Sequence, residues 1–236
     1  MKITSRHLSV EADGIPGFIA WPARARRGPG LLIIHHHFGV TGHIKATACD
    51  FAELGYATFA PNLYTLLGFP DYRGVQEKTT DGQFLEVIDS AWRYLLARPE
   101  VDPARAGAVG YCMGGRLGIH FAAATPSMRA FVGYYPSVRD EPPSRLRPRH
   151  PNDAAREIRC PSLIFFGAQD HVATIPVQDK LRASFLQNGQ PLDWHFFHRA
   201  GHGFALADGT DYLPDLARLA WSLTSNFLAH ALENEP

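Results

Sequence analysis

From residue 31 onward, short apolar segments alternate with segments of helical pattern, and this alternation constrains the fold more than any other feature. The run Leu31-Leu32-Ile33-Ile34 has no polar position, which is typical of a strand buried on both faces of a parallel sheet. Alternating strands and helices predict an α/β fold, with a mostly parallel central sheet and helices on both faces. We expect strands at 56–61, 106–111, 130–135, 162–167 and 194–197, and helices at 42–54, 84–97, 113–124, 174–187 and around 216–227.

Two segments differ from this pattern. Apolar runs at 3–10 and 17–22 flank the turn-like Ala12-Asp13-Gly14, which predicts an N-terminal antiparallel hairpin at the edge of the sheet. Residues 137–159 are rich in proline and charge, so we expect a long surface excursion. Excursions of this length in compact domains are often functional.

Size and charge narrow the class of protein. A chain of 236 residues suits one domain, 1–236, and its 23 basic and 23 acidic residues argue against a nucleic-acid partner. No apolar run is long enough for a membrane span, and no secretory signal is visible. Three scattered cysteines do not form a disulfide framework. We therefore expect a soluble, cytoplasmic protein without a membrane partner, as a monomer or weak homo-oligomer.

The sharpest motif is Gly110-Tyr111-Cys112-Met113-Gly114-Gly115, at the junction between the strand 106–111 and the helix 113–124. A tight strand-to-helix turn exposes its central side chain at the top of the sheet, and small flanking residues prevent clashes. The spacing is that of G-x-S-x-G with cysteine in place of serine. Taken alone, the motif leaves open a buried, inert cysteine beside glycines that pack a helix on a strand.

An acid and a histidine follow in the order that this arrangement requires. Asp170 comes after the strand 162–167, and His202 lies in a glycine-framed loop after the strand 194–197. Each also has an ordinary explanation: a turn or N-cap carboxylate for Asp170, and a surface imidazole for His202. Their joint occurrence with the cysteine motif favours a catalytic triad of Cys112, Asp170 and His202, because ligands bind beyond the carboxyl ends of parallel strands.

With these motifs the chain resembles the dienelactone hydrolase (carboxymethylenebutenolidase-like) family of the α/β-hydrolase superfamily over nearly its whole length. Further segments carry the resemblance: Phe38-Gly39-Val40, Pro61-Asn62-Leu63-Tyr64, Val132-Gly133-Tyr134-Tyr135, Gly167-Ala168-Gln169-Asp170 and Ala200-Gly201-His202-Gly203-Phe204. The resemblance implies an α/β-hydrolase fold and cleavage of an ester or lactone through a thioester, with no cofactor. It places the triad on Cys112, Asp170 and His202, and the oxyanion hole on the backbone N–H groups of His37 and Met113.

Two positions depart from the family's pattern. His36 stands where archetypal members have a glutamate bonded to the resting thiol, so we expect His36 to face Cys112 instead. Leu206 stands where they have an arginine that clamps a substrate carboxylate, which favours a neutral or bulkier ester. Arg73 could still supply a cation. The run His35-His36-His37 predicts no metal site, because adjacent residues of an extended segment point to alternate sides.

Aromatic residues near the predicted mouth of the site could line an apolar substrate pocket together with Leu206: Phe38, Tyr64, Tyr135 and Phe204. Two other classes of function stay open. One is a non-catalytic binder of a small molecule, and the other is a thiol-dependent detoxification protein. An acyl adduct on Cys112 would distinguish a hydrolase from the binder, and the absence of a C-x-x-C motif argues against the thiol-dependent protein.

Overall fold

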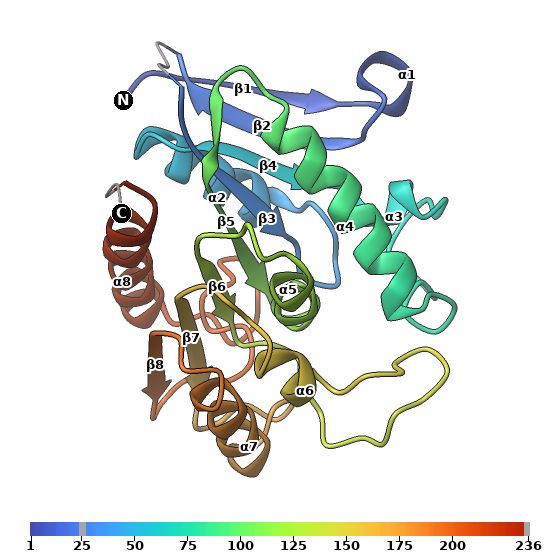
Figure 1. Ribbon diagram of the computed structural model, residues 1–236, viewed down its shortest axis with the longest axis vertical. Coiled ribbons are helices and arrows are strands. Elements are labelled where there is room, and N and C mark those ends of the chain that lie inside the picture. Colours follow the sequence, from blue (N-terminus) through green and yellow to red (C-terminus); the bar gives the residue numbers. More distant parts are fainter. Residues whose placement is uncertain (24–26, 234–236) are drawn as a thin grey trace.

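The computed structural model describes residues 1–23 and 27–233, and the strands among them form a single eight-stranded sheet (Figure 1). The order of strands is β1-β2-β4-β3-β5-β6-β7-β8. Their bounds are β1 (Ile3–Leu8), β2 (Gly17–Pro22), β3 (Gly28–Ile34), β4 (Ala57–Pro61), β5 (Val101–Tyr111), β6 (Phe131–Tyr134), β7 (Ser162–Gly167) and β8 (Leu192–Phe197).

The sheet is antiparallel at its N-terminal edge and parallel elsewhere. Strand β2 pairs antiparallel with both β1 and β4, and the pairings from β4 through β3 and β5 to β8 are parallel. This confirms the predicted architecture. The opening hairpin differs in one detail, because Val10 does not extend the first strand. Ser9 accepts the backbone N–H of Ala12 and caps a short helix, α1 (Val10–Asp13).

Helices cover both faces of the sheet, as the alternating pattern predicts. On one face pack α4 (Asp81–Leu96), α5 (Met113–Ala124) and α7 (Ile175–Leu186), and on the other α2 (Gly42–Glu53) and α8 (Pro214–Glu233). Strand β3 serves both layers, because Leu32 and Ile34 point to the first and Leu31 and Ile33 to the second. All four side chains are buried, which explains the uninterrupted apolar run.

Helix α4 begins at Asp81, three residues before the predicted start. Thr80 accepts the N–H of Gln83 while the Gln83 side chain accepts the N–H of Thr80, a reciprocal capping box that fixes this terminus. Two short helices had no clear sequence signal: α3 (Leu63–Leu66) and α6 (Pro151–Ala155). The first lies beside the loop that follows β3, so it helps to shape the functional end of the sheet.

Between β6 and α6 the chain makes the predicted excursion, and residues 138–150 contain no helix or strand (Figure 1, yellow). The loop is fastened to the start of α4, where the N–H of Asp81 donates to the carbonyl of Leu146. Within the described part of the chain, no helix is both long and apolar enough to cross a membrane.

Candidate active site

Cys112 lies between β5 and α5 in a sparsely populated backbone conformation with a positive φ of 51° and a ψ of −112°. The turn depends on close contact between α5 and the sheet. A Cβ atom on Gly114 would lie 2.0 Å from the carbonyl oxygen of Ile34, and one on Gly110 would lie 2.3 Å from that of Gly114. Only glycine fits at these two positions, which explains the glycines that flank the cysteine motif.

The structure brings Cys112, His202 and Asp170 together at the carboxyl end of the parallel strands. His202 Nε2 lies 3.0 Å from Cys112 Sγ, and His202 Nδ1 lies 2.9 Å from Asp170 Oδ2. Asp170 is buried, and its Oδ1 also accepts the backbone N–H groups of Val172 and Ala173. Fixed by these two donors, the carboxylate orients the imidazole so that Nε2 faces the sulfur.

The electrostatics favour a thiolate–imidazolium pair. Burial opposes ionisation of Cys112, but hydrogen bonds from His202 and His37 outweigh it and lower the thiol pKa to about 6. Burial likewise opposes protonation of His202, but its bonds to Asp170 and Cys112 raise the imidazole pKa to about 9. Between these values the sulfur is anionic and the imidazole cationic, so the Cys112 thiol is ionised at neutral pH.

The three consecutive histidines have three different environments. His35 is fully buried and bridges two segments: its Nδ1 donates to the carbonyl of His36, and its Nε2 accepts the N–H of Leu63. The expected contact between His36 and the thiol is not what the structure shows. The His36 ring accepts the N–H of Phe38 and bonds to Thr41 Oγ1, and burial lowers its pKa to about 3. The histidine beside the thiol is His37.

The peptide between His36 and His37 is held firmly. The carbonyl of His36 accepts hydrogen bonds from the His35 ring and from the N–H of Gly39, so the N–H of His37 points in the opposite direction within the peptide plane. Met113 is the first residue of α5, and its N–H has no acceptor within the helix. Both residues line the cavity at Cys112. That these two N–H groups form an oxyanion hole stays a prediction.

Most of the residues expected in an apolar pocket lie behind the site instead. Tyr64 is buried, and its hydroxyl donates to the carbonyl of His37 at 2.5 Å. Tyr135 packs edge-on against the His202 ring at 5.3 Å, and Phe204 packs against Tyr135 at 5.4 Å. These three side chains position the reactive groups, whereas Leu206 is partly exposed and is not among the described lining residues.

Phe38 is 47% exposed, is not among the described lining residues, and packs at a tilt of 40° against the His37 ring with the centroids 3.7 Å apart. Tyr72 contacts Phe38 edge-on at 5.4 Å. Arg73, which the sequence offered as a cation for the substrate, pairs with Asp71 on the surface and is not among the described lining residues. None of the aromatic residues expected in the pocket is therefore among the described lining residues.

The cavity at Cys112 has a volume of about 810 Å³, and the excursion forms a large part of its wall. The lining residues are His37, Gln76, Cys112, Met113, Arg116, Ser137, Arg139, Glu141, Pro142, Pro143, Ser144, Arg147, Arg149, His150, Pro151, His171, Val172 and His202. Sequence reasoning did not identify these arginines as site residues. The signal was present in the proline-rich, charged composition of 137–159, but composition does not say which side chains face a cavity.

No group of three or more metal-ligating side chains lies close enough together to hold a metal ion in the part of the chain that the structure describes. The fold, with a cysteine on the turn after a central strand and an aspartate and a histidine on later loops, defines an α/β hydrolase.

Within that class the family is specific. The model of the dienelactone hydrolase family matches residues 15–232, and the chain belongs to this family. It is 30% identical over 240 residues to the carboxymethylenebutenolidase of Pseudomonas putida, with 97% of this chain and 96% of the relative covered. The protein is thus a hydrolase of the lactone and ester kind.

Solved structures agree. A crystal structure from Klebsiella pneumoniae subsp. pneumoniae, assigned as a dienelactone hydrolase, superposes with a TM-score of 0.88 at 26% identity, covering 97% of this chain and 99% of that one. A dienelactone hydrolase from Anabaena variabilis shares the fold, with a TM-score of 0.71 at 18% identity and 98% of both chains covered.

Proposed function

We propose that this protein cleaves a carboxylic ester or lactone by transferring its acyl group to Cys112. The observation that carries the proposal is the continuous chain of contacts from Cys112 Sγ through the His202 ring to the Asp170 carboxylate, at 3.0 Å and 2.9 Å. The nucleophile is hydrogen-bonded to the base, and the base is hydrogen-bonded to the acid that orients it. Acyl transfer requires this arrangement.

In the first half-reaction, the Cys112 thiolate attacks the carbonyl carbon and forms a carbon–sulfur bond. The negative charge that develops on the carbonyl oxygen is stabilised by the backbone N–H groups of His37 and Met113. The carbon–oxygen bond to the leaving group then breaks. The imidazolium of His202 gives its proton to the departing alkoxide, and a thioester remains on the enzyme.

In the second half-reaction, neutral His202 takes a proton from water as the water attacks the thioester carbonyl. The same two backbone donors hold the oxyanion. When the carbon–sulfur bond breaks, the carboxylic acid leaves and the thiolate–imidazolium pair is restored. Asp170 keeps the imidazole in one orientation throughout and stabilises its charged form.

We further propose that the enzyme acts on its small ester or lactone without a cofactor, as a monomer or weak homo-oligomer in the cytoplasm. The three cysteines are all free, which fits a reducing compartment. His37 contributes to the mechanism by hydrogen bonding to the sulfur, a role that the sequence had placed on His36.

A screen of lactones and short acyl esters tests the proposal, with Cys112→Ala and Cys49→Ala run beside the wild type. We expect Cys112→Ala to abolish hydrolysis and Cys49→Ala to retain it, because Cys49 lies on α2, away from the site. Mixing the wild type with an activated ester and digesting it for mass spectrometry should show an acyl group on Cys112. Full turnover by Cys112→Ala would refute the proposal, and binding of esters without an adduct or turnover would indicate a binder instead.

A further inference from the structure

Gln178 is a buried polar side chain that the proposed mechanism does not use. It lies in the first turn of α7, and its exposed fraction is 2%. Its Nε2 donates to two backbone carbonyls, that of Gly167 at 2.9 Å and that of Ala173 at 2.7 Å. These carbonyls lie at the two ends of residues 167–173, which we call the Asp170 turn. Gln178 therefore bridges the segment that presents the acid of the triad.

Both ends of the Asp170 turn are also bonded to Asp170 itself. The carbonyl of Gly167 accepts the N–H of Asp170 at 3.4 Å, and the N–H of Ala173 donates to Asp170 Oδ1 at 2.9 Å. Each residue that Gln178 holds thus makes a second bond to Asp170, one to its backbone and one to its carboxylate. Because the turn is short, a displacement of either end would move the carboxylate.

The hydrogen bonds of Gln178 fix the orientation of its amide. An amide nitrogen has two N–H donors and an amide oxygen only accepts, so Gln178 can bond to two carbonyls only through Nε2. Its Oε1 is buried and has no hydrogen-bond partner among the described residues. An unpaired buried acceptor costs stability. We therefore look for the role of this glutamine in the turn that it holds.

The Asp170 turn packs tightly against the loop that carries His202. The N–H of Gln169 donates to the carbonyl oxygen of Ala200 at 2.9 Å, and a Cβ atom on Gly167 would lie 2.0 Å from the same oxygen. The two segments thus touch through backbone atoms. The 2.9 Å contact between His202 Nδ1 and Asp170 Oδ2 depends on both segments keeping their places.

This contact influences the charge on the sulfur. Burial opposes protonation of His202, but the bond to Asp170 helps to raise the imidazole pKa to about 9. Burial likewise opposes ionisation of Cys112, but the bond from His202 helps to lower the thiol pKa to about 6. A carboxylate displaced from Nδ1 would stabilise the imidazolium less, and a neutral imidazole would stabilise the thiolate less.

We propose that Gln178 is a positioning residue of the active site, which holds the Asp170 carboxylate against the His202 ring by bridging the two ends of the Asp170 turn. Gln178 is not among the described residues that line the cavity, so it acts through Asp170 and not on the substrate. The role of Asp170 as orienting acid rests on the proposed function. The position of its carboxylate can nevertheless be followed without turnover.

The test is Gln178→Met, which nearly keeps the length of the side chain and removes both N–H donors. One measurement is the midpoint pH of iodoacetamide alkylation at Cys112, followed by peptide mass spectrometry. The other is the pKa of His202, from an NMR titration of ¹⁵N-labelled histidine assigned with His202→Gln. We expect the Cys112 midpoint to rise, and the His202 pKa to fall, by about one pH unit each.

Turnover adds a third measurement. Because Gln178 does not line the cavity, we expect Gln178→Met to lower kcat for ester hydrolysis about tenfold and to leave KM unchanged.

The matched control is Ser184→Ala on the same helix. Ser184 is also buried, and its hydroxyl donates to the carbonyl of Lys180, away from the Asp170 turn. We expect this variant to keep the wild-type Cys112 midpoint and His202 pKa.

A conservative variant, Gln178→Glu, shows whether a donor restores the effect. While protonated, its carboxyl group can donate to one of the two carbonyls, and once ionised it can donate to neither. Burial favours the protonated form. We therefore expect a Cys112 midpoint between those of the wild type and Gln178→Met. If Gln178→Met does not fold, Gln178→Glu should still show part of the shift.

A Gln178→Met protein with the wild-type Cys112 midpoint and His202 pKa would overturn the proposal. A shift of the same size in Ser184→Ala would also overturn it, because the effect would then come from a general loosening of α7.

These outcomes are separable from the proposed function. A wild type that hydrolyses no ester, with a Cys112 midpoint that Gln178→Met raises, would support the positioning role and contradict the hydrolase. A wild type that hydrolyses esters, with a Gln178→Met variant of equal kcat and unchanged midpoint, would do the reverse.

Discussion

At the scale of single residues, environment rather than residue type decides what each histidine does. His35, His36 and His37 are consecutive, but the first bridges two segments, the second holds a turn, and the third bonds to the thiol. Burial lowers the pKa of His35 to about 4, so it stays neutral and keeps one donor and one acceptor nitrogen. A titrating His35 would break one of its two bonds.

The pH dependence of Cys112 reactivity follows from its environment. A thiol pKa of about 6, against the ordinary value of 9.0, means that the anionic nucleophile is lost only as pH falls through 6. We expect the rate of iodoacetamide alkylation at Cys112 to reach half its maximum near pH 6 and to be flat above pH 7. Burial raises the pKa of Cys49, so its rate should still be rising above pH 9.

Two histidine variants test whether His37, as the structure shows, or His36, as the sequence predicted, is the partner of the Cys112 thiol. His37→Ala removes a hydrogen bond that lowers the thiol pKa, and it should move the Cys112 midpoint upward. His36→Asn keeps an acceptor for the Phe38 amide and should leave the midpoint in place. The opposite result would restore His36 as the resting partner of the thiol.

At the scale of secondary-structure elements, the position of the nucleophile depends on how closely α5 approaches β3. Gly114→Ala would place a methyl group 2.0 Å from the carbonyl oxygen of Ile34, and neither backbone segment can move without displacing the other. We expect a loss of about 3 kcal/mol in the free energy of unfolding, with reduced Cys112 reactivity. Denaturant titration and alkylation measure both effects.

The matched control is Gly42→Ala at the start of α2. A methyl group there meets nothing within 4 Å, so the substitution should be neutral or stabilise by about 0.5 kcal/mol through the unfolded state. A Gly114→Ala protein as stable and reactive as Gly42→Ala would mean that α5 is not held against β3 in the way described.

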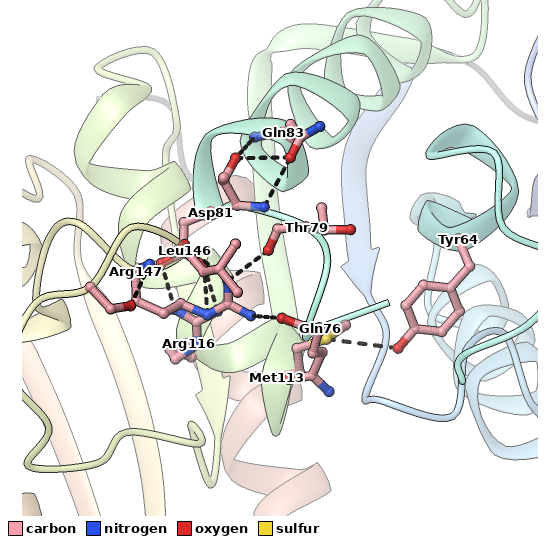
Figure 2. Close-up of polar contacts among 11 residues, drawn as sticks. Tyr64, Gln76, Thr79, Asp81, Gln83, Met113, Arg116, Leu146 and Arg147 are labelled. Atoms are coloured by element: carbon pink, nitrogen blue, oxygen red, sulfur yellow. Dashed lines mark hydrogen bonds and ion pairs between the residues drawn. The ribbon is translucent and has the colours of Figure 1, made fainter. Parts of the chain in front are cut away.

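The excursion between β6 and α6 is held in place along the cavity because Arg147 bonds to residues at and just before the start of α4 (Figure 2). Replacing Arg147 by methionine removes three carbonyl contacts and one carboxylate contact. We expect amides in 137–150 to exchange hydrogen about tenfold faster than in wild type, as opening costs less. Arg145→Met, two residues away on an exposed side chain, should not change the exchange. If amides in 137–150 exchange at the same rate in both variants, contacts other than those of Arg147 hold this segment in place.

At the scale of the whole molecule, buried imidazoles make stability depend on pH. His35 and His120 have pKa values lowered to about 4, mainly by burial, and His36 to about 3. Below pH 6.5 these histidines are protonated in the unfolded chain but stay neutral in the folded chain. The free energy of unfolding therefore decreases as the pH is lowered from 6.5 to about 4. Each such proton contributes a slope of about 1.4 kcal/mol per pH unit.

His120→Phe tests this account. Its Nε2 has no hydrogen-bond partner among the described residues, so a phenyl ring removes no bond from that atom. Between pH 6.5 and 4.5 we expect the free energy of unfolding to fall less in the variant than in wild type. The difference in slope should be at most about 1.4 kcal/mol per pH unit, the contribution of one proton. Thermal unfolding across this pH range gives the measurement, and parallel curves for the two proteins would contradict the prediction.

The sequence predicted the sheet, its antiparallel edge and the three residues that meet at its carboxyl end. It did so because strand and helix periodicity, glycine spacing and chain order are local properties. The cluster of Asp81, Arg116 and Arg147 is different. Arg116 and Asp81 are 35 residues apart, and nothing in either segment specifies that they meet. The cavity wall likewise depends on where a loop without periodicity lies on the folded molecule.

The positive φ at Cys112 means that the residue needed for activity is not the residue that would make this fold most stable. A non-glycine residue at φ 51° and ψ −112° is strained by about 1–3 kcal/mol, whatever its side chain. Cys112→Gly should therefore unfold at a higher temperature than Cys112→Ala, although both lack the nucleophile. Selection for thermal stability alone would favour glycine at this position, and the protein would lose its nucleophile.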